Sequence, residues 1–167
     1  MRPKWLRVNP SIRSFILGEV ERQYHPIGTD EYSSRVEQMT NAWQWALESK
    51  NERPTMDDML HCAYIIEPEL NHQGFRTTGV WIANREGADY TQVPHMVTEL
   101  WTHIEDIEPV QGRTNGLNTA DDFYLEFEVI HPFGDGNGRT GKLIHNWILG
   151  TLDKPVLVYD YFGGGNP

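Results

Sequence analysis

The chain has 167 residues and a formal net charge of −10, and this length suits one domain that buries about two-thirds of its unfolded surface. The acidic balance argues against a nucleic-acid-binding protein, because such a protein needs basic patches for phosphates. The one cysteine, Cys62, permits no internal disulfide and favours a reducing compartment.

No run of apolar residues approaches the length of a membrane span, so we expect no membrane partner. The N-terminal residues 1–9 carry charges but lead into no apolar stretch of the kind found in signal peptides, and we read them as an irregular arm. We therefore expect a cytoplasmic protein, with delivery into another cell left open.

Apolar residues recur at helical spacing in several segments, each bounded by capping residues, glycine or proline. The pattern predicts helices over about 10–23, 31–49, 55–67, 94–107 and 119–130, and a last helix that ends near residue 152. Between the third and fourth helices, residues 74–82 are rich in β-branched and aromatic residues, and a turn cluster follows at 84–87. This composition predicts a β-hairpin. Residues 155–159 predict a short strand or extended run.

The stretch 131–142, immediately before the last helix, concentrates polar groups and glycines: His-Pro-Phe-Gly-Asp-Gly-Asn-Gly-Arg-Thr-Gly-Lys. Glycines at a helix start leave backbone N–H groups pointing outward, and the helix dipole adds positive potential, which suits a phosphate. Arg139 and Lys142 share one helix face and can both reach a phosphate chain. Asp135 can hold Mg²⁺ between phosphates, and His131 can accept a proton near neutral pH.

Two other motifs overlap this stretch. Gly136 to Lys142 also reads G-x-x-x-x-G-K, but Leu143 follows where a Walker A loop needs Ser or Thr, so that interpretation is weak. The stretch also begins like an EF-hand loop, but Thr140 stands at the sixth position and Asn146 at the twelfth. Glycine and glutamate are needed there, so an EF-hand is excluded.

The stretch closely resembles the Fic motif, H-P-F-x-[D/E]-G-N-G-R-x-x-R, and departs from it only at Lys142, where the motif has arginine. The resemblance implies a mainly α fold, a Fic-type helical bundle with a small β-hairpin (the flap) beside the active site. It implies one Fic-like domain over 1–167, made of an N-terminal arm and helix (1–30), a candidate inhibitory helix (31–50) and the Fic core (55–160).

The resemblance also implies a protein adenylyltransferase, which moves AMP from ATP to a Tyr, Ser or Thr hydroxyl of a target protein and releases pyrophosphate. In that role His131 would deprotonate the hydroxyl, and Asp135 would hold Mg²⁺. The nucleotide would be bound by Gly136, Asn137, Gly138, Arg139 and Lys142. Lysine at the last position keeps the charge but loses the two-pronged grip of arginine on the γ-phosphate.

Residues from Gly74 onward resemble the Fic flap, G-x-[F/Y]-R followed by an alternating strand. The flap holds the target segment in extended form through main-chain hydrogen bonds, a use that suits an unpaired strand edge. The implied target-binding residues are Phe75, Arg76, Thr77, Thr78, Gly79 and Val80. An ordinary hairpin is the alternative interpretation.

The start of the second helix resembles the Fic inhibitory motif, S/T-x-x-x-E-[G/N]. Ser33 and Glu37 fit this pattern, and Gln38 departs from it. The resemblance implies that Glu37 faces Lys142 and displaces the γ-phosphate. A capping serine followed by a solvated glutamate explains the same residues, so both interpretations stay open.

Other functions remain open from sequence alone. A Fic-fold phosphotransferase, or a non-catalytic binding module in a toxin–antitoxin or phage complex, would use the same fold, and the partner would be a second copy or an antitoxin-like protein. A Walker-type ATPase would release ADP rather than pyrophosphate. His145 and Asn146 fit either the core or the nucleotide side, and Tyr161 and Phe162 are candidates for one edge of the base pocket.

Overall fold

The computed structural model describes residues 8–22 and 27–158. Within these ranges the fold is mainly helical, with a single two-stranded antiparallel sheet, which confirms the predicted fold class. The helices are α1 (Pro10–Arg22), α2 (Asp30–Glu48), α3 (Met56–Ile66), α4 (Pro68–Asn71), α5 (Val93–Thr102), α6 (Ala120–Ile130) and α7 (Asn137–Leu149). The strands are β1 (Trp81–Ile82) and β2 (Arg85–Glu86), and the short 3₁₀ helix η2 (Tyr90–Gln92) leads into α5.

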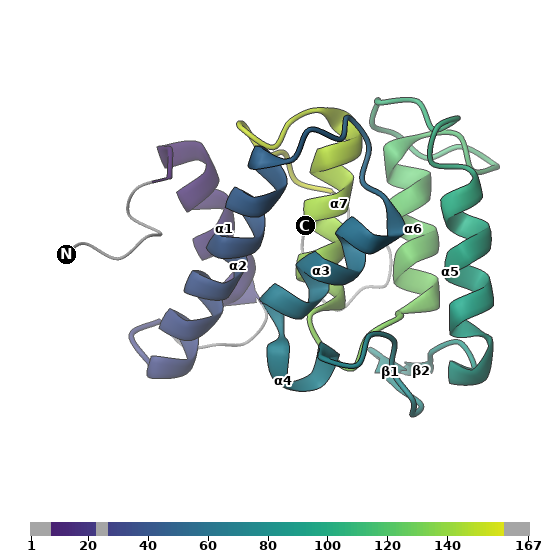
Figure 1. Cartoon of the computed structure of the whole chain (residues 1–167), viewed down its shortest axis with the longest axis horizontal. Coiled ribbons are helices and arrows are strands. Elements are labelled where there is room, and N and C mark those ends of the chain that lie inside the picture. The colour runs from purple at the N-terminus through teal and green to yellow at the C-terminus, as the bar shows by residue number, and fades with distance from the viewer. Residues whose placement is uncertain (1–7, 23–26, 159–167) are drawn as a thin grey trace.

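Helix α7 lies in the middle of the bundle. It packs against α6, α3 and α2, and Figure 1 shows α1 and α2 on one side of it and α6 and α5 on the other. Short α4 and the β1–β2 hairpin lie together at one end of the molecule. The core is dominated by large apolar side chains that are fully buried, among them Trp43, Phe123, Phe127, Met39 and Met59.

Two of the helices around α7 begin with the same capping arrangement. The Thr55 side chain accepts a hydrogen bond from the Asp58 backbone N–H, and the Asp58 carboxylate accepts one from the Thr55 N–H. Thr119 and Asp122 repeat this reciprocal pair at the start of α6. Because these caps are local signals, the starts of both helices could be predicted from sequence.

Helix α5 ends at Thr102 and not near residue 107 as predicted. Ile104 and Ile107 remain buried, so the apolar spacing continues through a turn and mimics a longer helix. The guanidinium of Arg53 donates to the backbone carbonyls of Ile104 and Ile107, at 2.7 Å each. A side chain distant in sequence therefore satisfies the carbonyls that a longer helix would have used.

Helix α3 ends at Ile66, which confirms the predicted end near residue 67 before Pro68, and Pro68 then starts the short helix α4 in its first turn, where proline is tolerated. Gly150, with a φ of 74°, ends α7 a few residues before the predicted residue 152. Of the two interpretations of residues 155–159, the strand is wrong for 155–158. The backbone of Val156 bonds instead with the Asn146 side chain, which accepts from its N–H and donates to its carbonyl. Tyr159, Tyr161 and Phe162 lie outside the described residues.

The predicted hairpin exists but is shorter and lies later in the chain. Its strands are β1 and β2, with Trp81 opposite Glu86 and Ile82 opposite Arg85. The residues from Phe75 to Val80 form no strand. In the described residues, no helix is both long and apolar enough to cross a membrane.

Helix α1 is attached to α7 by a buried ion pair. Lys142 Nζ donates to Glu19 Oε2 at 2.7 Å, across 123 residues of sequence, and the two side chains are only 4% and 0% exposed. Taking two charges out of water is costly, so each partner depends on the other for compensation. This contact fixes the position of α1 against the central helix.

We predict that Glu19→Ala lowers the free energy of unfolding by about 3–5 kcal/mol, because it leaves the Lys142 ammonium buried without its counter-charge. The double variant Glu19→Ala/Lys142→Met should recover most of that loss. Urea unfolding followed by circular dichroism measures both values. Glu21→Ala, at an exposed position of the same helix, is the control and should change stability by less than about 0.5 kcal/mol. Equal losses in the single and double variants would contradict this account of the ion pair.

Candidate functional site

His131 lies at the point where α6 ends. It has the left-handed backbone conformation, with φ 50° and ψ 65°, and its N–H donates to the Phe127 carbonyl at 2.9 Å. Residues other than glycine seldom adopt this conformation, so the surrounding contacts must hold it. The imidazole is 18% exposed, and its Nδ1 lies 3.3 Å from the Glu128 carbonyl. One ring edge is thus held by α6 while the residue stays at the surface.

Arg76 holds this turn from the opposite side. Its backbone N–H donates to the Pro132 carbonyl at 2.9 Å. Its guanidinium donates to the carbonyls of His131 at 2.6 Å and Ile130 at 3.2 Å, and also to the carbonyl of Ala88 at 2.5 Å. A cation on the free carbonyls at a helix C-terminus is favourable. The predicted flap residue Arg76 therefore faces inward and positions His131.

The imidazole of His131 is held in its neutral form. Burial lowers its pKa to about 4, and the positive charges of Arg76 and Arg85 act in the same direction. The Glu128 carbonyl and the charge of Asp135 oppose this shift without reversing it. At neutral pH His131 is therefore unprotonated and has a lone pair ready to accept a proton.

The loop between His131 and α7 is closed by the Asn137 side chain. Its Oδ1 accepts from the Phe133 N–H at 2.8 Å, and its Nδ2 donates to the Phe133 carbonyl at 2.9 Å. Gly136 has a φ of 75°, and a Cβ there would lie 3.1 Å from Ile66 Cγ2, so both the backbone conformation and the close contact favour glycine. Asn137 thus shapes the loop with its side chain.

The backbone at the start of α7 is the candidate for an anion site. The first N–H groups of a helix have no partner inside the helix, and the helix dipole makes this end positive. In α7 these groups belong to Asn137, Gly138 and Arg139. The helix start that the glycine pattern indicated is present at Asn137, and such an N-terminus can bind a phosphate.

Asp135 lies beside this N-terminus. Its Oδ1 accepts from the Gly136 N–H at 2.7 Å, its side chain is 48% exposed, and Asn71 Nδ2 donates to its carbonyl at 3.0 Å. Among the described residues, no three His, Cys, Asp or Glu side chains gather in a way that could hold a metal ion. One accessible carboxylate next to a phosphate site is the arrangement that suits Mg²⁺, which keeps several waters and uses substrate phosphates as ligands.

Arg139 is buried close to Asp135. Its Nη2 lies 3.8 Å from Asp135 Oδ1 and 3.8 Å from Glu67 Oε2, while its Nε and Nη1 have no hydrogen-bond partner. Burial lowers its pKa to about 10, and Arg35 adds to the shift while Asp135 opposes it. Since buried donors are normally satisfied, the two unpartnered donors make Arg139 a candidate for binding an anion.

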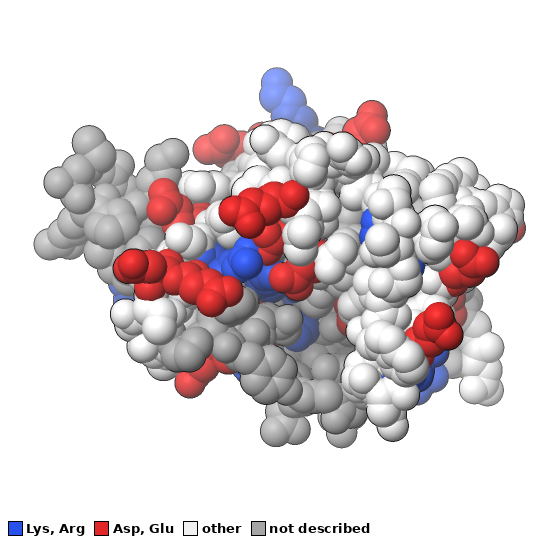
Figure 2. Space-filling model, turned by 90° about the horizontal axis from the view of Figure 1, so that it is seen from below, with Lys and Arg blue, Asp and Glu red and all other residues white. Residues whose placement is uncertain are grey.

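No sequence pattern indicated the acidic partner of Arg139. Glu67 is buried between α3 and α4, and its Oε2 also pairs with Arg35 Nη1 of α2. Figure 2 views the end of the molecule that carries α4 and the hairpin, and it shows basic surface set among acidic side chains. Arg35 of α2 and Arg139 of α7 therefore share the carboxylate of Glu67.

The two cations that were expected to share a phosphate chain have different partners in the structure. Arg139 faces Asp135 and Glu67, whereas Lys142 pairs with Glu19. Ser33 and Glu37 are both exposed on α2. The carboxylate that the structure places on Lys142 therefore belongs to α1 and is not the one that the inhibitory motif indicated.

The remaining residues of the predicted flap differ in how exposed they are. Phe75 packs against the core and stacks near Phe133, with ring centroids 5.8 Å apart, while Thr77 to Gly79 are exposed. Sequence reasoning missed Trp81, which is 71% exposed on β1. His145 is fully buried with Nε2 2.7 Å from Asp121 Oδ1, so it belongs to the core.

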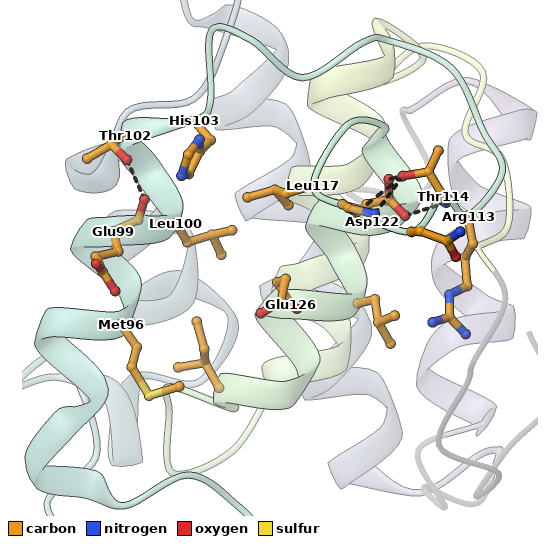
Figure 3. A pocket seen from close by; sticks show the side chains of 14 residues that line it. Met96, Glu99, Leu100, Thr102, His103, Arg113, Thr114, Leu117, Asp122 and Glu126 are labelled. Carbon is orange, nitrogen blue, oxygen red and sulfur yellow. Dashed lines mark hydrogen bonds between the residues drawn. The ribbon is translucent and has the colours of Figure 1, made fainter.

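A separate groove of about 620 Å³ lies on the far side of α6. Figure 3 shows side chains of α5 facing those of α6 and of the loop between the two helices, with Met96, Leu100, Leu117 and Glu126 among them. It contains none of the residues from 131 to 142. We therefore treat it as distinct from the phosphate site.

Comparisons with known proteins show which family the chain resembles. The model of the Fic/DOC family matches residues 55–149. A probable protein adenylyltransferase of Aquifex aeolicus (strain VF5) is 63% identical over 27 residues, which are 16% of this chain and 8% of that protein. The ribonucleoside-diphosphate reductase small chain of Ostreid herpesvirus 1 (isolate France) is 40% identical over 45 residues, 27% of this chain and 8% of that protein.

A solved structure gives the same fold over most of the chain. A Fic family protein from Desulfovibrio desulfuricans G20 superposes with a TM-score of 0.60 at 22% identity, covering 84% of this chain and 44% of that one. The chain thus spans less than half the length of this relative. The family match includes the whole stretch from His131 to Lys142 and more than half of the chain, and this protein therefore belongs to the Fic/DOC family.

Proposed function

We propose that this protein is a protein adenylyltransferase, which transfers AMP from ATP to a Tyr, Ser or Thr hydroxyl of a target protein and releases pyrophosphate. The observation that carries the proposal is the position of neutral His131 beside the α7 N-terminus, where Asp135 acts on its pKa and Arg139 holds two unpartnered donors. The short match to a probable protein adenylyltransferase supports the same reaction.

Each group in the site has a task in this reaction. The N–H groups at the start of α7 would bind the α-phosphate, and the Arg139 guanidinium would bind the β-phosphate. His131 would take the hydroxyl proton while the hydroxyl oxygen bonds to the α-phosphorus and the bond to the leaving pyrophosphate breaks. Asp135 is the residue that would hold Mg²⁺, which when bound neutralises phosphate charge.

The target would approach along the exposed residues Thr77 to Gly79 and the hairpin. Among the described residues, the strands β1 and β2 pair only with each other, so their outer edges can bind an extended segment by main-chain hydrogen bonds. Arg76 would tie this edge to the catalytic turn, because it contacts carbonyls on both sides. The proposal thus gives His131, the nucleotide site and the hairpin one common function.

We predict that His131→Ala lowers protein labelling from α-labelled ATP by about 100-fold or more, since it removes the general base. Labelling would be measured with purified protein, Mg²⁺ and cell lysate. His95→Ala on α5, whose imidazole is 70% exposed, is the matched control and should label like wild type. Full labelling by His131→Ala would contradict the assignment of the base.

We predict that the His131 imidazole titrates well below its ordinary pKa of about 6.5, because its burial and the nearby arginines disfavour the charged form. A folded-state pKa lowered to about 4 leaves the ring neutral from pH 7 down to about pH 5. An NMR titration of the ring protons measures it directly. Arg85→Gln should move the value upward, and an ordinary pKa in the wild type would contradict the burial of this ring.

We predict that Arg76→Lys lowers kcat by about 10- to 100-fold with little change in nucleotide affinity, because lysine keeps the charge but cannot bind several carbonyls at once. Kinetics and nucleotide titration separate these two quantities. Arg85→Lys on β2 is the control for charge at the hairpin. An unchanged kcat in Arg76→Lys would contradict this role, because it would show that His131 is positioned without the several hydrogen bonds of the Arg76 guanidinium.

A further inference from the structure

A cluster of charged side chains joins α2 to the start of α7. Glu67, which is 2% exposed, pairs through its Oε2 with Arg35 Nη1 of α2. Arg139 Nη2 of α7 lies 3.8 Å from the same oxygen. Because both contacts end on one carboxylate oxygen, the two guanidinium groups are neighbours. Burial is the main cause that lowers the pKa of Arg139, and the positive charge of Arg35 adds to it.

Both guanidinium groups have open donors. Within the part of the chain that the structure describes, three of their buried nitrogens have no hydrogen-bond partner: Nε of Arg35, and Nε and Nη1 of Arg139. Arg35 Nη2 lies 3.8 Å from Glu31 Oε1, which is longer than a hydrogen bond. Buried donors are normally satisfied, so open donors on two adjacent arginines point to an anion that binds both.

The cluster keeps a positive charge after its internal pairing. Arg35 and Arg139 are both cations, and Glu67 neutralises only one of them. Two guanidinium groups at this separation repel each other, and the carboxylate between them offsets that repulsion before any ligand binds. A forked cation pair of this kind suits a diphosphate, whose two adjacent phosphates offer several oxygens as acceptors.

Arg35 can be reached from outside and lies outside the family match. Its side chain is 17% exposed, and Figure 2 shows basic surface at this end of the molecule. Helix α2 ends before residue 55, where the match to the Fic/DOC family begins. The matched stretch therefore contains Arg139 but not Arg35.

We propose that Arg35 is a second guanidinium ligand of the nucleotide diphosphate, and that Glu67 holds it beside Arg139. Helix α2 thereby takes part in binding the donor. The ligand class is a nucleoside diphosphate unit, because AMP carries only the phosphate assigned to the first N–H groups of α7. The inference rests on the proposed function, since it concerns the donor of that same site.

The test is titration calorimetry with ADP and with AMP, both in Mg²⁺. We expect Arg35→Gln to weaken ADP binding by about 10-fold and to change AMP binding by less than about twofold. Lys50→Gln, at an exposed position just after α2, is the matched control and should bind both nucleotides like wild type. Thermal unfolding establishes which variants are folded.

Two further variants separate a direct contact from an indirect effect. Arg35→Lys keeps the charge and the partner of Glu67 but loses the guanidinium fork, and we expect ADP to bind about fivefold more weakly. Arg35→Gln in a Glu67→Gln background removes the carboxylate that Arg35 neutralises. A direct ligand predicts that this double variant still binds ADP about 10-fold more weakly than Glu67→Gln alone.

Wild-type ADP affinity in a folded Arg35→Gln or Arg35→Lys variant would overturn the inference, and AMP transfer could still proceed. Full recovery of ADP binding in the double variant would also overturn it, because Arg35 would then act only by neutralising Glu67. The expected losses without any AMP transfer by the wild type would support the inference and contradict the proposed function. Failure of the wild type to bind ADP would overturn the two together.

Discussion

The site depends on a chain reversal that is completed between α6 and α7 within six residues. The reversal needs two residues with positive φ, His131 at 50° and Gly136 at 75°. It is kept tight by the Asn137 side chain and by Arg76, which binds the carbonyls at the end of α6. It places His131, the proposed base at the end of α6, beside the N-terminus of α7, the proposed anion site. Gly141 allows α7 to approach closely, because a Cβ there would lie 3.0 Å from Phe127 Cδ1.

The charges of the site are balanced by residues from the first half of the chain. Arg139 faces Glu67 from the α3–α4 junction, and Lys142 pairs with Glu19 from α1. The two pairings differ in kind, since Glu67 lies 3.8 Å from Arg139 and leaves donors open, while Glu19 bonds Lys142 directly. Arg139 thus keeps donors that a ligand could use, whereas Lys142 is held in an ion pair within the fold. This difference follows from burial and distance, because both residues carry the same formal charge.

Sequence predicted the parts of the site that are encoded locally. Caps such as Thr119 with Asp122 and the apolar spacing of α6 and α7 indicated the helices, and the glycines before α7 indicated a phosphate site. Contacts over long sequence separations could not be read in this way. Nothing in the sequence indicates that Glu19 would meet Lys142, since an acidic residue on a helix is usually solvated. Arg76 was predicted as a target-binding residue of the flap. Its inward position could not be predicted, because a pattern of residue types does not show that backbone carbonyls at the end of α6 need a donor.

The most direct test of the account is mass spectrometry of a protein modified by this chain in the presence of ATP and Mg²⁺. The account predicts that a Tyr, Ser or Thr side chain of the target gains an adenosine monophosphate group and that pyrophosphate appears in solution. A target that gains only a phosphate group, with ADP as the other product, would contradict attack at the α-phosphate and with it the assignment of the anion site at the start of α7.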